Sequence, residues 1–422
     1  MKKISPQLLY CKNLNNEFGE NIKTDGNSVY QWNGVFWQEW NEKDAIRHAF
    51  NWLARNQQEH ASEKYATSCF SSSLLHLPQF NAIDDSSVKI PTLNSYVVVN
   101  SDGHIKSIQP NKNLGLRYVV NCEFNKDATC LTFKEFIKEA IPCNETRDFL
   151  QEYTGYTLLN DVRHQLAAWL IGDGGTGKDT FLQVITALHR NTISLSLDSL
   201  DGFKLSLLKD ASLACVDETP KKIDEERIKT IISGDLIQVD RKHRDPISVR
   251  PQAKWFVCGN ALPYVNDSSS GFWRRWIIFP FNVKPKQKKL LLAEKIINTE
   301  LSGVLNWALE GLSRLLKRGE FPPLTDQMRS AIGDGRKHSD SIAQWLEDCG
   351  VEFDENCKNT RTDVYSHYST WCRESNVKPE GSPRFWEKIK MKFPGLPDSR
   401  QANREMVEGK RKAVVNISLP IL

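Results

Sequence analysis

The segment at residues 170–180, LIGDGGTGKDT, constrains the fold and function of this chain more than any other. An apolar, strand-like run leads into the spacing GxxxxGK, which is typical of a phosphate-binding loop at the start of a helix. Glycines let the backbone amides curve around a polyphosphate without Cβ clashes, and the helix adds its positive N-terminal end. We therefore predict a nucleotide site made of these residues: Gly172, Gly174, Gly175, Thr176, Gly177, Lys178, Asp179 and Thr180.

Asp179 is unusual at the position that follows the lysine, because such loops usually carry Ser or Thr there. The usual hydroxyl ligates magnesium. A carboxylate can also hold the ion, but it brings a negative charge towards the phosphate oxygens. We expect ATP and Mg²⁺ as the cofactors, with Asp179, Thr180 and Asp217 as candidate metal ligands. A glycine-rich turn that binds no phosphate is the alternative.

Two adjacent carboxylates, Asp217 and Glu218, lie at the end of the apolar run ASLACVDET, residues 211–219. In a nucleotide hydrolase, the first carboxylate of such a pair can hold magnesium while the second polarises the attacking water. An Asp–Glu pair alone is a weak signal, and it gains weight from its position downstream of a phosphate loop. We predict Lys178, Asp217 and Glu218 as catalytic residues.

The segment DLIQVDRKHRDPISVR, residues 235–250, has two alternating arms and predicts a hairpin. Its tip carries four adjacent basic residues: Arg241, Lys242, His243 and Arg244. Clustered cations repel one another unless an anion lies nearby, so we predict that this tip binds DNA phosphates. A solvated charged turn is the alternative interpretation.

Two further patterns add catalytic candidates. Asn260 ends the strand-like run KWFVCGN, and in ring-forming ATPases an asparagine at this place orients the lytic water, the role called sensor 1. The run GFWRRW sets Arg274 and Arg275 between bulky apolar residues, which suits an arginine finger that reaches a neighbouring subunit's nucleotide. For Asn260, an ordinary turn asparagine is the alternative.

Taken in order, the phosphate loop, the Asp–Glu pair, the basic hairpin, the asparagine strand and the arginine pair resemble the motifs of superfamily 3 helicases. The runs GDGGTGKDTF and GFWRR are similar to those in the helicase half of phage and plasmid primase-helicases, the branch that includes poxvirus and satellite-phage enzymes. This resemblance implies a hexameric ATPase ring that moves 3′ to 5′ along single-stranded DNA. It also implies that Lys242 and His243 follow the DNA and that Arg274 or Arg275 is the finger. Asp179 departs from the pattern of the branch, and we expect no fused primase ahead of the helicase.

We predict an α/β fold with an AAA+-like P-loop ATPase core, a mixed α+β N-terminal region and a C-terminal winged-helix domain. The expected divisions are an N-terminal region at 1–130, a helical collar at 131–165, the ATPase core at 166–320, a linker at 321–339 and the winged-helix domain at 340–422.

Several local elements are also predicted. Three tryptophans surround an Asn-Gly turn that is typical of a hairpin, and we expect core packing rather than base stacking for them: Trp32, Trp37 and Trp40. Strands are expected at 95–100 and 117–122. A long helix is expected at 290–317, with a break near residues 302–303, and the basic run before it, residues 284–289, is expected to be solvated.

The last 80 or so residues show three short amphipathic helices and a basic hairpin, a pattern that resembles a winged helix. The third helix carries basic residues that we expect to lie off its apolar stripe, to face solvent and to bind duplex phosphates: Arg384, Lys388, Lys390 and Lys392. An ordinary solvated helix face is the alternative.

Composition limits the class of protein. No apolar run approaches the roughly 20 residues of a membrane helix, and the first residues lack the apolar core of a signal peptide, so we expect a cytoplasmic protein. The ten cysteines include no CxxC pair, which argues against a zinc ribbon or a small disulfide scaffold and favours reduced thiols. A net charge of +4 does not indicate DNA binding by itself, so the clusters of basic residues matter more.

Together these patterns predict an ATP-dependent replicative DNA helicase of a phage, plasmid or mobile element. The expected partners are single-stranded and forked DNA, further copies of the chain and a separate primase, with no membrane. Two alternatives remain open. One is a DNA-binding or origin-binding P-loop protein with weak or absent ATPase activity, and the other is a P-loop nucleotide kinase, because GKDT also occurs in kinases.

Overall fold

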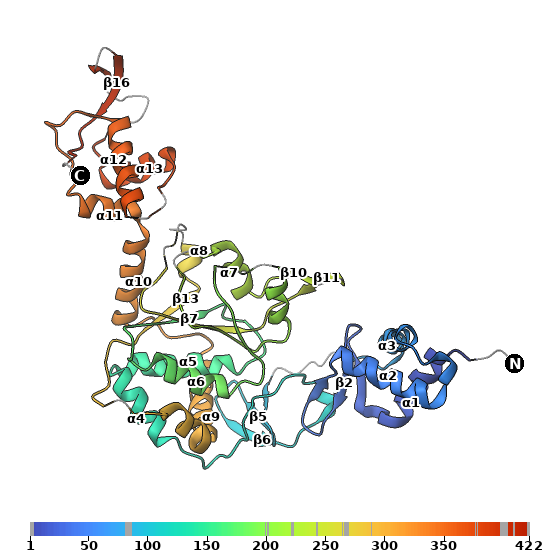
Figure 1. The fold of residues 1–422 in the computed structure, drawn as a ribbon. Helices are drawn as coiled ribbons and strands as arrows, with labels where there is room; N and C mark the ends of the chain where they lie inside the picture. The colour runs from blue at the N-terminus through green and yellow to red at the C-terminus, as the bar shows by residue number, and fades with distance from the viewer. Residues whose placement is uncertain are drawn as a thin grey trace.

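The computed structural model describes most of the chain: residues 4–80, 87–198, 200, 202–220, 223–241, 244–263, 265, 270–287, 289–375, 377, 379–396, 404–407 and 410–419. The polypeptide forms three parts that follow one another in space (Figure 1). An N-terminal part leads into a central α/β core, and a single helix connects that core to a C-terminal part.

The N-terminal part packs three helices beside a small antiparallel sheet of order β1-β2-β3. Its elements are α1 (Pro6–Phe18), η1 (Gly19–Asn21), β1 (Ile22–Thr24), β2 (Val29–Trp32), β3 (Trp37–Glu39), α2 (Glu42–Asn56), η2 (Gln58–His60) and α3 (Glu63–His76). The predicted hairpin is confirmed, with Trp32 paired to Trp37 across the turn. Trp37 is fully buried, which agrees with core packing, whereas Trp32 and Trp40 are partly buried.

A second antiparallel sheet joins this part to the core. It contains β4 (Val88–Pro91), β5 (Tyr96–Val99) and β6 (Ile105–Ile108), and η3 (Lys112–Leu114) follows. The predicted strand at 95–100 is confirmed, but the one at 117–122 is wrong. There the backbone N–H groups are divided, since Val120 donates to Pro91 and Asn121 donates to Leu188, so no single partner strand forms.

The central core is a five-stranded sheet in which all neighbouring strands are parallel, in the order β13-β7-β12-β9-β8. The strands are β7 (Ala167–Ile171), β8 (Thr192–Ser194), β9 (Leu213–Val216), β12 (Lys254–Gly259) and β13 (Trp276–Pro280). Gly259 of β12 lies opposite Ile171 of β7, and Val257 lies opposite Val216 of β9. The segments that follow β7, β12 and β9 therefore leave the sheet at the same edge.

Alternate residues of β7, β9, β12 and β13 pack against elements on opposite faces, as a doubly covered sheet requires. One face is covered by α4 (Leu131–Ala140), α5 (Asn144–Thr157), α6 (Lys178–Ala187) and α9 (Leu292–Arg318). The other is covered by η4 (Gly202–Lys209), α7 (Glu225–Ile232), α8 (Ser270–Trp273) and the hairpin of β10 (Ile237–Arg241) and β11 (Arg244–Val249). The two groups of helices lie below and above the sheet in Figure 1.

Helix α9 is continuous, so the predicted break near residues 302–303 is wrong. The glycine has a packing role instead, because a Cβ on Gly303 would lie 2.2 Å from the backbone of Thr129. The helices of the predicted collar, α4 and α5, share one hydrophobic core with α9 and the sheet.

The C-terminal part has a hydrophobic core of its own. It contains α11 (Ser341–Asp348), β14 (Asn359–Thr360), α12 (Arg361–Glu374), α13 (Ser382–Lys392), β15 (Arg404–Val407) and β16 (Lys410–Val415), with a sheet of order β14-β16-β15. Most of the segment at 321–339, predicted as a linker, is helix α10 (Asp326–Ser339), which spans the distance between the two parts in Figure 1.

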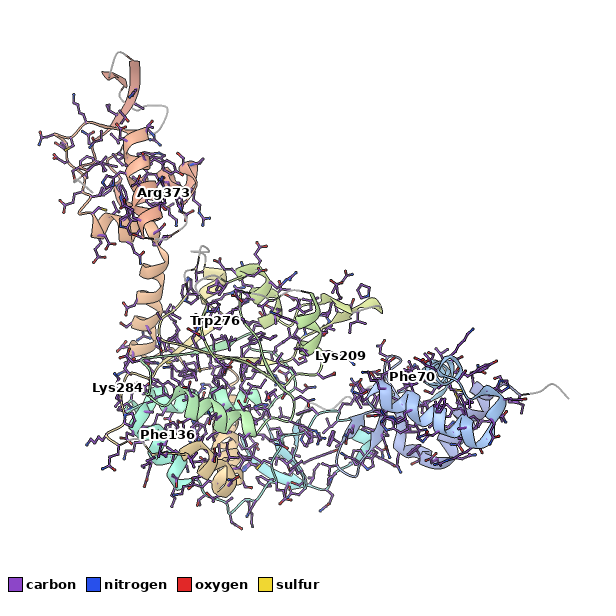
Figure 2. All side chains as sticks on the ribbon, viewed as in Figure 1. Phe70, Phe136, Lys209, Trp276, Lys284 and Arg373 are labelled. Atoms are coloured by element: carbon purple, nitrogen blue, oxygen red, sulfur yellow. The ribbon has the colours of Figure 1, made fainter. Side chains whose placement is uncertain are left out.

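A polar contact joins the N-terminal part to the core. The Lys209 Nζ donates to Glu39 Oε1 at 3.1 Å, and Lys209 lies on the side of the core that faces the N-terminal part (Figure 2). All ten cysteines carry free thiols. Among the described residues, no helix is both long enough and apolar enough to cross a bilayer.

Candidate functional site

The phosphate loop lies between the end of β7 and the start of α6, as the sequence predicted. Gly175 and Gly177 adopt φ angles of +80° and +97°, a region that side chains rarely enter. A Cβ on Gly177 would also lie 2.7 Å from the ring of Phe136. The loop conformation therefore depends on glycine at this position, where the chain turns into the helix.

Lys178 is buried and folded back onto its own loop. Its Nζ donates to the carbonyl oxygens of Gly172 at 2.6 Å and Asp173 at 2.8 Å, and Thr176 Oγ1 donates to the same Asp173 oxygen at 2.9 Å. These acceptors are neutral, so a charged phosphate at the loop would be a stronger partner for the ammonium. The lysine is thus held beside the amides that would bind phosphate.

A cavity of about 300 Å³ opens beside the loop. Residues 175–180 of the loop and of α6 form one side of it. The apolar residues of its walls come from α4, from the segment between β13 and α9 and from the first residue of α9: Phe136, Ala140, Val283, Pro285, Leu290, Leu291 and Leu292. Phe136 and Lys284 lie on this same side of the core in Figure 2. The backbone N–H of Lys286 donates to Glu139 Oε1 at 3.1 Å, which holds Lys286 against α4.

Leu290 and Leu291 are 90% and 69% exposed, although leucine is normally buried. Leu291 also has a φ of +54°, a conformation that costs a non-glycine residue about 1–3 kcal/mol. The lysines described in the basic run at 284–289 are exposed, as predicted, but sequence reasoning missed the wall beside them. The leucines that follow the basic run were the available signal.

Asp217 and Glu218 follow β9 at the carboxyl edge of the sheet, and both are exposed. Ser194, at the end of β8, donates from Oγ to Asp217 Oδ2 at 3.2 Å, which orients that carboxylate. Thr219, the next residue, is a contact that sequence reasoning missed. Its Oγ1 donates to the carbonyl of Cys258 at 3.0 Å and accepts from Trp169 Nε1 at 2.9 Å, so it ties the end of β9 to β12 and β7.

Asp179, Lys178 and Asp217 all influence the pKa of Cys258, which lies near the end of β12. Burial raises the pKa of the Cys258 thiol to about 12, and the negative charges of Asp179 and Asp217 add to this effect while Lys178 opposes it. Asn260 is exposed and directly follows β12, where the N–H of Gly172 donates to the preceding carbonyl at 3.2 Å. The structure therefore gathers the phosphate loop, the Asp–Glu pair and Asn260 at one edge.

In the part of the chain that the structure describes, no group of three or more His, Cys, Asp or Glu residues is arranged to hold an ion. The candidate ligands Asp179, Thr180 and Asp217 would leave most positions around Mg²⁺ to phosphate oxygens and water, which is the usual way this ion is bound beside a nucleotide.

The two arginines of the GFWRR run differ in their surroundings. Arg275 is partly buried, and its Nε and Nη2 donate to Ser233 Oγ at 3.0 and 2.9 Å. Arg274 is exposed. Phe272 and Trp273, which precede the pair, are buried in the core and fix the backbone from which Arg274 projects.

The predicted basic hairpin is confirmed as an antiparallel pair of strands, with Arg241 opposite Arg244 in register. Its predicted tip residues, Lys242 and His243, lie outside the described residues, as do the side chains of Arg241 and Arg244.

On helix α13, Arg384, Lys390 and Lys392 are exposed, as predicted. The expectation that Lys388 faces solvent is wrong. Its side chain is only 18% exposed, and its Nζ contacts Glu380 Oε1 at 2.8 Å. Because its ammonium is paired with Glu380, Lys388 is less suited than the exposed residues of α13 to bind an external phosphate.

The comparisons agree with the class that this geometry defines, a mixed α/β protein with a P-loop-like core. A family of unknown function (DUF5906) matches residues 170–275, and the poxvirus D5 protein-like family matches residues 337–412. A protein of Acanthamoeba polyphaga mimivirus, named as a putative helicase, is 24% identical over 174 residues. That match covers 37% of this chain and 17% of the relative, so the chain spans less than a fifth of the relative's length.

Solved structures share the arrangement of the whole chain. Two apo structures of the C-terminal region of NrS-1, residues 305–718, align with TM-scores of 0.51 and 0.50, both at 11% sequence identity. They cover 98% and 99% of this chain and 100% of that region. This likeness shows the fold. The partial sequence matches make the chain similar to helicase-like proteins of viruses.

Proposed function

We propose that this chain is an ATP-dependent DNA helicase of the superfamily 3 type with an AAA+-like core. One observation carries the proposal: the phosphate loop after β7, Asn260 after β12 and the carboxylates Asp217 and Glu218 after β9 leave the sheet at the same edge. Parallel sheets of this kind bind their ligands at the carboxyl ends of the strands. In the order β7-β12-β9, Asn260 lies between the phosphate loop and the Asp–Glu pair. This order supports hydrolysis, because polar side chains would lie on both sides of a bound terminal phosphate.

The proposed roles follow from position. The loop amides and the start of α6 bind the phosphates, and Lys178 exchanges its carbonyl partners for phosphate oxygens. Glu218 polarises the attacking water and Asn260 orients it. Asp217, with Asp179 or Thr180, would hold Mg²⁺, which would neutralise charge at the phosphates.

The cavity beside the loop suits the nucleotide base. Its volume of about 300 Å³ lies at the lower end of the usual range for ligand pockets, and its walls combine apolar side chains with polar groups of the loop and of Glu139, Gln287 and Lys289. The exposed Leu290 and Leu291 would lose contact with water when a base covers them.

We propose Arg274, rather than Arg275, as the finger that reaches a neighbouring subunit's nucleotide. Support comes from the contrast between the exposed Arg274 and the anchored Arg275. A finger acts on a nucleotide that its own subunit does not bind, so the proposal includes assembly of copies into a closed ring, with six subunits expected from the resemblance.

DNA is proposed to contact two surfaces. The β10–β11 hairpin, through Lys242 and His243, follows single-stranded DNA, and the C-terminal part binds the duplex of a fork as a winged helix. The helix order α11, α12, α13 and the sheet order β14-β16-β15 support the second assignment, with Arg384, Lys390 and Lys392 as phosphate contacts. A separate primase remains a proposed partner.

A hydrolysis assay with Mg²⁺, with and without single-stranded DNA, tests the proposal. We expect Lys178→Ala to abolish turnover and the control Lys12→Ala, an exposed lysine of α1, to retain it. Lys242→Ala should keep basal turnover and lose unwinding of a forked duplex. Wild-type protein that neither hydrolyses ATP nor responds to DNA would contradict the proposal.

A second candidate function is favoured by Asp179, which is exposed at the loop where a hydroxyl is usual. In this alternative the chain binds DNA and nucleotide without turnover, because the carboxylate repels the phosphates. The comparison of wild type with Asp179→Ser distinguishes the two. A silent wild type beside an active serine variant favours the alternative, whereas comparable turnover in both supports the helicase.

A further inference from the structure

Arg275 connects the segment that carries Arg274 to the end of helix α7, which leads into the β10–β11 hairpin. Its guanidinium donates twice to the hydroxyl of Ser233, at 3.0 and 2.9 Å, and once to the carbonyl of Gly271. Burial lowers the pKa of this guanidinium, and the charge of Arg274 lowers it further, while Asp235 acts in the opposite direction. A partly buried cation needs good partners, and Ser233 supplies an acceptor from a different element.

Ser233 lies where helix α7 ends and the hairpin begins. It is the C-terminal cap of α7, and β10 starts four residues later at Ile237. Gly234 between them has a φ of +70°, and a Cβ there would lie 2.4 Å from Val162. This tight packing leaves the base of the hairpin little freedom to absorb a displacement locally.

The other end of the connection is the finger. Arg275 directly follows Arg274, and Trp276, which begins β13, packs against Trp169 of β7 with the two rings tilted and their centroids 4.1 Å apart. Trp276 lies inside the core in Figure 2. Strand β13, which follows the finger, is therefore held in place by its packing. A displacement of Arg274 by a neighbour's nucleotide would be passed on through the Arg275–Ser233 contact.

We propose that Arg275 is a positioning residue whose hydrogen bonds to Ser233 couple the finger Arg274 to the base of the DNA hairpin. This inference rests on the proposed function and names the contact through which nucleotide in one subunit is linked to the hairpin of the next. When Arg274 engages a phosphate, Arg275 shifts with it, and the cap of α7 and the first residues of β10 follow. Arg275 keeps its bond to Gly271 in either case, so loss of Ser233 removes the coupling and spares the presentation of Arg274.

The test uses the full chain with Ser233→Ala, Ser233→Thr and Thr230→Ala. Thr230 is a matched control because it lies on the same helix and its hydroxyl donates only within that helix, to Glu226. For each variant, steady-state ATP hydrolysis is measured without and with single-stranded DNA, together with base pairs unwound per ATP on a forked duplex.

We expect Ser233→Ala to hydrolyse ATP without DNA within about twofold of wild type. It should lose about tenfold or more in DNA stimulation and in unwinding per ATP, because both charge-assisted hydrogen bonds from Arg275 are lost. Ser233→Thr keeps the hydroxyl and should match wild type, as should Thr230→Ala. Normal coupling in Ser233→Ala overturns the inference alone. An equal fall in basal and DNA-stimulated hydrolysis also overturns it, because that is the effect of a structural role. A wild type without ATP turnover overturns the proposed function itself.

Discussion

Lys254 provides a prediction whose size can be worked out from the structure. Its side chain is buried at the start of β12, where Nζ donates to the carbonyls of Leu159 and Gln252 and lies over the ring of Tyr156. Burial lowers the pKa of this ammonium to about 7. Asp161 opposes the change and Arg163 adds to it.

The sign of the pH effect follows from proton uptake. Between about pH 7 and the ordinary pKa of 10.5, the folded lysine is neutral and the unfolded lysine is charged, so unfolding takes up a proton. The contribution of Lys254 to the free energy of unfolding therefore rises with pH through this window. That contribution is lowest below pH 7. The limiting slope is about 1.4 kcal/mol per pH unit, or about 3 kcal/mol between pH 7.5 and 9.5.

The assay is urea unfolding of the core at pH 7.5, 8.5 and 9.5, for wild type and Lys254→Met. Methionine keeps roughly the length of the side chain and removes the charge. The variant also leaves the carbonyls of Leu159 and Gln252 without this donor, but that destabilisation does not depend on pH and so does not affect how stability changes with pH. We expect the stability of wild type relative to Lys254→Met to rise by about 3 kcal/mol over this range. Lys138→Met, an exposed lysine of α4, should show no such change. A wild-type-to-variant difference that stays flat with pH would refute the argument.

Three further predictions concern packing and the site. Gly303→Ala should destabilise the core by about 1–3 kcal/mol in thermal unfolding, because the added Cβ would clash with the Thr129 backbone. The control Gly333→Ala, whose Cβ would lie in open space, should be neutral or slightly stabilising. Leu291→Gly should relieve about 1 kcal/mol of backbone strain yet raise the KM for ATP about tenfold, and an unchanged KM would exclude this wall from the base site. Thr219→Val should lower kcat about tenfold with KM unchanged, because the hydrogen bonds that join β9 to β12 and β7 are lost, while Thr219→Ser should retain activity. A lower kcat together with a raised KM would indicate a general defect instead.

Elements with strong local signals could be predicted from the sequence. The phosphate loop needs glycines at fixed positions, so the strand β7, the loop and α6 follow from composition and spacing. Alternation around a basic turn likewise indicated the β10–β11 hairpin, and an apolar run ending in carboxylates indicated β9. In each case the residues that specify the element lie within the element.

Three of the errors have a similar cause, since each depended on a contact with a residue outside the element itself. The strand expected at 117–122 divides its hydrogen bonds between Pro91 and Leu188, and nothing in its own residues reports those partners. Gly303 resembles a helix break locally, yet it allows close approach to Thr129. Lys388 is folded against Glu380 of the preceding loop, which a helical wheel cannot show.

The candidate site was predictable for its charged groups and not for its apolar wall. Lys178, Asp217 and Asn260 each end or follow an apolar run, and parallel strands bring such ends to one edge. The wall at Leu290 and Leu291 comes from an irregular segment that folds back over α4, and such a path has no sequence periodicity. The difference between Arg274 and Arg275 also required the position of Ser233.

Subunit mixing tests the central claim most directly, namely that a neighbour's Arg274 completes the site built around Lys178. Lys178→Ala subunits lack the nucleotide contact but keep the finger, and Arg274→Ala subunits keep the nucleotide contact but lack the finger. We expect each variant alone to be inactive and an equal mixture to recover up to about one quarter of wild-type ATP hydrolysis, the share of interfaces that pair an intact loop with an intact finger. No recovery on mixing, or full activity of Arg274→Ala alone, would contradict a site shared between subunits.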